Sequence, residues 1–183
     1  MLLLGLVVVA LLVGWLSGGK LASLDLTGLR LWWLAPLGLG IQLIPLDEPW
    51  AIPVLMTSYA VLVVFALVNV RVAGFALVLI GLAMNWLVIG LNGGMPVDIT
   101  RSGDPAAQVK LAEEGGSKHH VMSDDDSLAF LGDTIWVEGI REVYSPGDLV
   151  LYAGVVWFIV AGMRSGRNRY PEEQWGAERY RPE

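Results

Sequence analysis

Five long apolar runs constrain the fold of this chain more than any other feature of its sequence. They cover about residues 1–16, 31–46, 51–70, 73–91 and 147–163, and none carries a charged residue at its centre. A helix needs about 20 apolar residues to cross the hydrocarbon core of a bilayer, and shorter spans are accommodated by local thinning. Because no run alternates like a barrel strand, the sequence predicts an all-α integral membrane bundle of five transmembrane helices.

The composition agrees with a membrane protein and excludes several other classes. Of the 183 residues, 55% are hydrophobic and 16% are charged, whereas soluble domains average about 25% charged residues. The net charge of -6 argues against nucleic acid as a partner, because phosphate binding needs a basic surface. The absence of cysteine excludes disulfides and thiolate chemistry. We expect one membrane domain, residues 1–163, followed by a polar cytoplasmic tail, residues 164–183.

The first apolar run could be a signal peptide or a retained helix. No basic residue precedes its apolar stretch, and the SGGKLAS sequence that follows is a poor cleavage site. We therefore expect residues 1–16 to remain as the first transmembrane helix.

The distribution of charge predicts the orientation of the bundle. Acidic residues such as Asp47 and Glu48 gather on one side of the predicted membrane, and basic residues flank the helices on the other. Lysine and arginine are enriched in cytoplasmic loops, so we predict that the amino terminus is outside and the carboxyl terminus in the cytoplasm. The basic residues that flank helices on the cytoplasmic side are Lys20, Arg30, Arg71, Arg164, Arg167 and Arg169.

The segment between the fourth and fifth runs, residues 92–146, is expected to form a helical cap on the outer side. Asp104 and Pro105 favour the start of a first short helix, and Gly115 favours its end. A second short helix is predicted from SDDDSLAFLGDTIWV, residues 123–137, with an apolar strip that would be costly to expose to water. The strip comprises Phe130, Leu131, Ile135 and Trp136.

The start of the last helix carries its own signals. In the sequence SPGD, Ser145 and Asp148 are spaced as the two partners of a capping box, and Pro146 suits the first helical position. We therefore expect Ser145 and Asp148 to cap the fifth transmembrane helix.

The stretch SKHHVMSDDD, residues 117–126, contains both histidines of the chain. His119, His120 and Asp124 are candidate metal ligands, because imidazole and carboxylate together bind divalent ions. However, no HExxH-like spacing is present, and three aspartates before an apolar run are typical of a helix amino terminus. Histidine also titrates near neutral pH, so a proton-linked or ligand-binding role is an alternative. We favour a structural role, in which His120 hydrogen-bonds an acidic neighbour, with Asp124 and Asp133 as the favoured partners, and holds the cap in place.

The sequence GLNGGMPVD, residues 90–98, is the second candidate site. Asn92, Gly93 and Gly94 are typical of a helix end, and Pro96 favours an extended chain after it. A phosphate site is disfavoured here, because phosphate binds the amides of a helix amino terminus and carbonyls face outward at this end.

Several of these motifs resemble one family. The chain resembles small bacterial multi-pass membrane proteins that carry an uncharacterised domain, so the resemblance implies a bacterial cytoplasmic membrane. It supports the architecture, leaves the activity open, and implies that His120 and Asp133 matter more than His119. The matching positions are Asn92, Gly93, Gly94, Met95, Pro96, Val97, His120, Asp124, Leu128, Leu131, Asp133, Ser145, Gly147 and Asp148.

Polar residues inside the predicted spans are few. Gln42, Asn69 and Asn85 are amides, which more often link helices than mark a transport pathway. No nucleophile elbow, phosphate-binding loop or pair of catalytic carboxylates is visible. We expect a non-catalytic membrane protein without a cofactor. It would be either an accessory or assembly subunit, which associates with a membrane protein partner or with itself, or a binder of a small ligand or lipid at its outer face. The alternative is a membrane-embedded enzyme or transporter that uses His120, Asp124 and Asp133, with or without a metal ion.

Overall fold

The computed structural model describes residues 2–24, 26, 28–46, 49–101, 118–139 and 142–165, and this part of the chain is mostly helical. The sequence therefore predicts the dominant secondary structure correctly. The α-helices are α1 (Leu2–Leu16), α2 (Leu34–Gln42), α3 (Ala51–Val68), α4 (Phe75–Asn92) and α6 (Pro146–Ser165).

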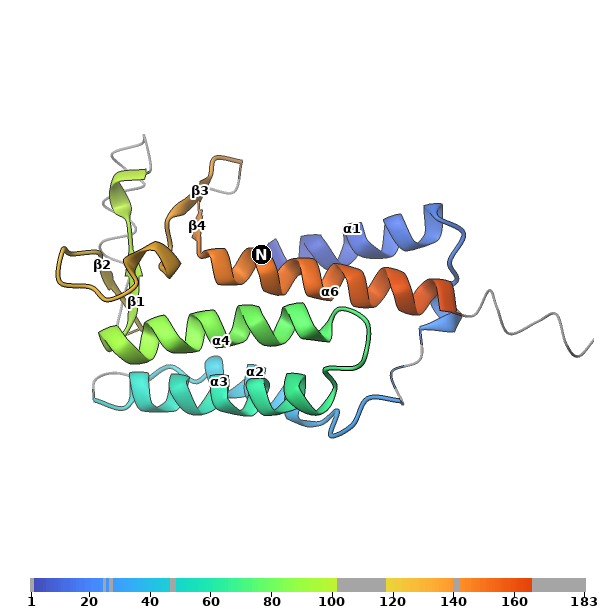
Figure 1. The fold of residues 1–183 in the computed structure, drawn as a ribbon, viewed down its shortest axis with the longest axis horizontal. Helices are drawn as coiled ribbons and strands as arrows, with labels where there is room; N and C mark the ends of the chain where they lie inside the picture. Colours follow the sequence, from blue (N-terminus) through green and yellow to red (C-terminus); the bar gives the residue numbers. More distant parts are fainter. Residues whose placement is uncertain are drawn as a thin grey trace, which may run out of the picture.

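The helices form an elongated bundle in which α4 occupies the centre (Figure 1). On one side α4 contacts α6, which is covered by α1, and on the other side it contacts α3, which is covered by α2. The strands and loops between α4 and α6 gather at one end of the bundle (Figure 1). We call the described residues 93–101, 118–139 and 142–145 the cap, and the end of the bundle that carries them the cap end.

Three helices of the described chain are long and apolar enough to cross a membrane, namely α3, α4 and α6. The helix α1 has 15 residues. The prediction for the second span is wrong in its length, because α2 has only nine residues and is about 14 Å long at 1.5 Å per residue. Leu31, with a φ of 52°, interrupts the helical backbone before it, and two glycines with low helix propensity lie within it.

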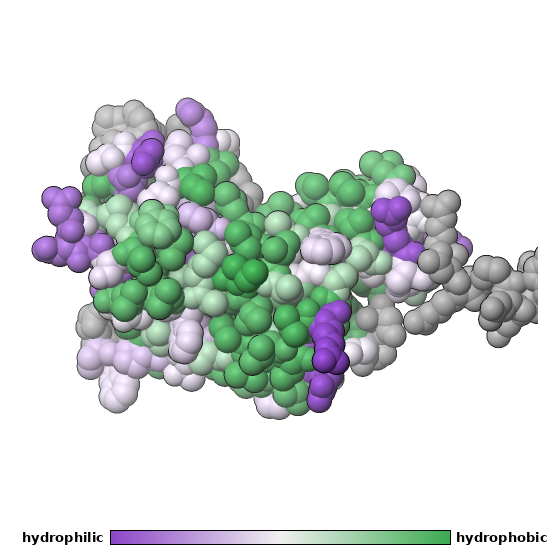
Figure 2. Space-filling model, in the orientation of Figure 1, coloured by the Kyte–Doolittle hydropathy of each residue, from purple (hydrophilic) through white to green (hydrophobic). Residues whose placement is uncertain are grey.

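The surface of the bundle is apolar between its two ends. Figure 2 shows hydrophobic residues across the middle of the face in view and hydrophilic residues gathered toward the ends. Large side chains such as Leu12, Leu67, Ile80 and Trp157 are exposed on the helices. Exposed apolar surface of this extent marks contact with a membrane or another protein. Together with the three long apolar helices, it indicates a membrane protein.

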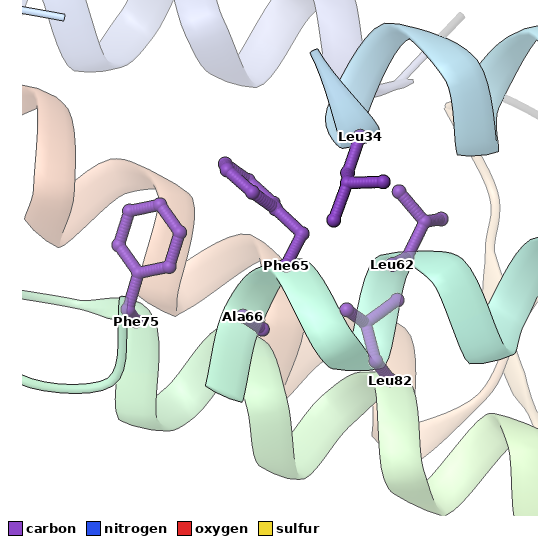
Figure 3. Close-up of a cluster of buried hydrophobic side chains, with 6 residues drawn as sticks. All are labelled: Leu34, Leu62, Phe65, Ala66, Phe75 and Leu82. Atoms are coloured by element: carbon purple, nitrogen blue, oxygen red, sulfur yellow. The ribbon is translucent and has the colours of Figure 1, made fainter. Parts of the chain in front are cut away.

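The core of the bundle joins four helices. Phe65 from α3, Phe75 from α4 and Phe158 from α6 stack edge to face, with ring centroids 5.4 Å and 5.3 Å apart in successive pairs. Such edge-to-face geometry is favourable for aromatic rings. Leu34 brings α2 into the same cluster, which Figure 3 shows with Phe65 and Phe75.

Paired glycines bring α4 and α6 into close contact. A Cβ atom at Gly81 would meet the backbone of Gly147, and a Cβ atom at Gly74 would meet the backbone of Gly154. In each helix the two glycines are seven residues apart, so they lie on one face, and the pairing shows that the helices are antiparallel. Small residues at such positions allow helix backbones to approach closely in a membrane.

The cap contains short strands where the sequence predicts helices. Strand β1 (Met95–Val97) pairs in parallel with β2 (His119–Val121), and β3 (Ile135–Val137) pairs with β4 (Glu142–Tyr144) in antiparallel fashion. An isolated parallel bridge joins Val97, at the end of β1, to Asp133, which precedes β3. The first predicted cap helix, with Asp104, Pro105 and Gly115, lies outside the described residues, as do Asp47, Glu48 and the tail beyond Ser165.

The second predicted cap helix is not present. Residues 129–131 form only a single 3-10 turn, preceded by Leu128 with a φ of 54°, and residues 135–137 are extended. The apolar strip is divided as a result. Leu131 packs on the bundle cluster that contains Leu55 and Val88, whereas Phe130 is 67% exposed.

Candidate functional site: a polar pocket between bundle and cap

A cavity of about 300 Å³ lies where the cap meets the bundle. Its walls come from four helices and from the cap, and they combine amide, hydroxyl and charged groups with a few apolar side chains. The lining residues are Gln42, Leu55, Tyr59, Asn85, Ile89, Met95, Lys118, His119, Asp133 and Asp148.

The amino terminus of α6 places Asp148 in this pocket. The backbone N–H of Asp148 donates to Ser145 Oγ at 2.9 Å, and the backbone N–H of Ser145 donates to Asp148 Oδ2 at 3.2 Å. This reciprocal pair of hydrogen bonds satisfies two backbone donors at the helix start. It also fixes the direction in which the Asp148 carboxylate points.

Asn85, in the middle of α4, connects this helix start to the bundle. Its side chain is 1% exposed. Asn85 Nδ2 donates to Asp148 Oδ1 at 2.8 Å, and Ser145 Oγ donates to Asn85 Oδ1 at 2.9 Å. The contact requires glycine at position 147, because a Cβ atom there would overlap Asn85 Oδ1.

Asp133 enters the pocket from the cap and is only 9% exposed. Its backbone N–H donates to the Pro96 carbonyl at 2.9 Å, and its carbonyl accepts from the Asp98 N–H at 2.9 Å. Within the described chain, its carboxylate accepts no hydrogen bond, and His119 Nε2, which forms an ion pair with it only when the imidazole is protonated, is 3.9 Å away. Burial, with a further contribution from the negative charge of Asp148, raises the pKa of Asp133 to about 8.

Lys118 and His119 lie on the cap side of the pocket. Lys118 Nζ donates to the backbone carbonyl of Gln42 at 2.8 Å and so joins the cap to the end of α2. The His119 side chain is 45% exposed. The pocket therefore combines two acidic side chains, Asp133 and Asp148, with the basic side chain of Lys118.

The two histidines have different surroundings. His119 lines the pocket, whereas His120 Nε2 hydrogen-bonds Asp126 Oδ1 at 2.8 Å. Consecutive side chains of a strand point to opposite faces, which explains the difference. His120 therefore has an acidic hydrogen-bond partner as predicted, but the favoured partners were wrong, because it is Asp126 rather than Asp124 or Asp133.

The side chain of Asp126 is held by Ser123 as well as by His120. It also accepts a hydrogen bond from the Ser123 N–H at 2.7 Å. Burial opposes ionisation of Asp126, but the hydrogen bonds from Ser123 and His120 outweigh it and lower the pKa of Asp126.

Asp124, a candidate metal ligand in the sequence, is exposed. Among the described residues, no group of three or more His, Asp or Glu side chains is arranged to hold a metal ion.

The end of α4 anchors the cap. Gly93 has a φ of 66°, a left-handed conformation that favours glycine, and the Gly94 N–H donates to the Ile89 carbonyl at 3.1 Å. Asn92 Nδ2 donates to the Ser127 carbonyl at 2.9 Å, and the Ser127 N–H donates to Asn92 Oδ1 at 2.8 Å. Asn92 thus ties the helix end to a distant part of the cap.

Pro96 is fully buried within β1. Its carbonyl, which accepts from Asp133, fixes the position of the acidic part of the pocket.

Sequence reasoning identified parts of this pocket but not the pocket itself. Gln42 and Asn85 stood out only as polar residues within apolar spans, and Asp148 only as a helix cap. Tyr59 and Lys118 carried no sequence signal, because their role depends on which helices become neighbours.

Comparisons with known proteins identify the family of the chain. No curated protein and no solved structure matches it. Residues 27–160 match a family of unknown function, DUF5317, and this match covers α2, α3, α4, the cap and most of α6. The chain therefore belongs to DUF5317, a family of unknown function.

Proposed function

We propose that this protein is a multi-pass protein of the bacterial cytoplasmic membrane that binds a small polar ligand at its outer face. The observation that carries the proposal is the cavity of about 300 Å³ at the cap end. Ligand sites are typically cavities of about 300–1,000 Å³ in which a few polar groups converge among apolar ones, often between helices of a bundle. The pocket has such a mixture of polar and apolar side chains, and it lies between helices of the bundle.

The arrangement of basic residues supports an outward-facing cap end. Arg71 lies in the turn between α3 and α4, and Arg164 lies in the last turn of α6, both at the end opposite the cap. Lys20 joins them there, because its N–H donates to the Met163 carbonyl at 2.9 Å. If this basic end faces the cytoplasm, as positively charged loops do, the pocket opens on the outer side.

Binding fits the geometry better than the alternative of an enzyme or transporter that uses His120, Asp124 and Asp133. His120 hydrogen-bonds Asp126, whereas Asp133 faces the pocket and Asp124 is exposed. These three candidates therefore do not form one constellation. The hydrogen bond between His120 and Asp126 supports a structural role for His120.

Native mass spectrometry of the protein purified in mild detergent tests the proposal. We expect a bound small molecule in the wild type and its loss in Gln42→Trp, because the larger side chain fills the pocket. The matched control is Leu43→Trp, since Leu43 is next in sequence but 83% exposed. Equal retention of the molecule by both variants would contradict a site in this pocket.

A further inference from the structure

We propose that the ligand of the pocket carries a protonated amine, and that its ammonium group binds between the carboxylates of Asp133 and Asp148. The inference rests on the proposed function, because it concerns the same pocket. It adds the chemical class of the ligand and the residues that recognise it.

The first observation concerns the burial and the hydrogen bonding of the Asp133 carboxylate. Its side chain is 13% exposed and lines the cavity, yet no donor in the described chain hydrogen-bonds its carboxylate. The His119 imidazole is its ion-pair partner only when protonated, and its Nε2 is 3.9 Å away, beyond hydrogen-bond distance. Because the carboxylate lines the cavity, a donor supplied by a ligand can reach it and form a charge-assisted hydrogen bond.

The second observation is the position of Asp148. Its two oxygens accept from Asn85 and Ser145, which orient the carboxylate toward the same cavity. A carboxylate has about four acceptor positions, so Asp148 retains capacity for a ligand. After the larger effect of burial, the negative charge of Asp148 also raises the pKa of Asp133, so the two carboxyl groups lie close enough to interact.

An ammonium group fits this part of the pocket better than a metal ion or an anion. It offers three N–H donors, which match two carboxylates and one further acceptor such as Gln42 or Tyr59. A divalent ion needs more ligands than two carboxylates, and the described residues provide no group of three for it. An anion would be repelled by the negative charge of Asp148.

The other groups around the pocket limit the ligand further. Leu55, Ile89 and Met95 provide an apolar wall that suits a short alkyl body. Lys118, held by the carbonyl of Gln42, contributes a positive charge on the cap side of the pocket. The ammonium group is therefore expected to bind at the two aspartates, away from Lys118.

Ethanolamine is a suitable probe, with ethylene glycol as a neutral analogue of similar size and acetate as an anion. In thermal unfolding of the full chain in detergent, we expect ethanolamine to stabilise the wild type saturably and the other two probes to have no effect. Asp133→Asn should weaken ethanolamine binding about tenfold or more, because a charge-assisted hydrogen bond is lost. Asp124→Asn, at an exposed position, should bind like the wild type.

The amine inference is overturned if ethanolamine gives no saturable stabilisation, or if Asp133→Asn binds it as tightly as Asp124→Asn does. It is also overturned if acetate or ethylene glycol binds instead. In each of these cases, a co-purified molecule that Gln42→Trp loses would still support the pocket itself, so failure of the inference and failure of the proposed function are distinguishable. Asp133→Asn keeps the size and backbone hydrogen bonds of the residue, and a cooperative melt confirms that it folds.

Discussion

The replacement Asp133→Asn should change how stability depends on pH, even without ligand. The pKa of Asp133 is raised from 3.8 to about 8 in the folded protein. Between these values the folded protein holds a proton that the unfolded chain has released, so stability falls as pH rises. At about 1.4 kcal/mol per pH unit, the full effect is on the order of 5 kcal/mol above pH 8 and is absent below pH 4.

Thermal unfolding followed by tryptophan fluorescence, at a series of pH values from 5 to 9, measures this effect. We expect the melting temperature of Asp133→Asn to rise above that of the wild type as pH increases, because asparagine has no charge to bury. Four other titratable side chains also face the pocket, namely Tyr59, Lys118, His119 and Asp148. They are present in both proteins, so subtracting one melting temperature from the other removes most of their contribution to the pH dependence. Parallel curves for the two proteins across this range would refute the assignment of Asp133 as a buried, protonated carboxyl group.

Three further predictions concern packing and capping. Gly147→Ala should destabilise the bundle by about 2 kcal/mol through overpacking, whereas Gly40→Ala, where a Cβ meets nothing within 4 Å, should be neutral or stabilising; thermal melts compare them. Ser145→Ala should cost about 1 kcal/mol in the same assay because α6 loses its cap, and a melt like the parent's would contradict this. Asn92→Ala removes two hydrogen bonds to Ser127 and should ease opening of the cap by about 2 kcal/mol, which faster tryptic cleavage in the cap would report.

The parts of the fold that sequence predicts well depend on residues close together in the chain. The apolar runs of α3, α4 and α6 are long enough to define helices without knowledge of their neighbours. Position 93, where α4 ends, is another local case, because a left-handed residue there favours glycine.

Other parts depend on contacts between distant segments and could not be read from the sequence. Helix α2 is short and contacts α3 through Gly38, whose carbonyl accepts a hydrogen bond from Ser58 at 2.8 Å. The cap strands have three residues each, too few for a period-two pattern to be visible. His120 hydrogen-bonds Asp126 because parallel pairing of β2 with β1 sets which face each histidine occupies.

The central claim is that the polar pocket opens on the outer side of the membrane. Because the chain has no cysteine, His119→Cys and Arg71→Cys can each be labelled without background, one at the pocket and one at the opposite end of the bundle. In sealed, right-side-out vesicles, we predict that a membrane-impermeant maleimide labels His119→Cys from outside and labels Arg71→Cys only after permeabilisation. Labelling of Arg71→Cys from outside, with His119→Cys protected until permeabilisation, would contradict the account.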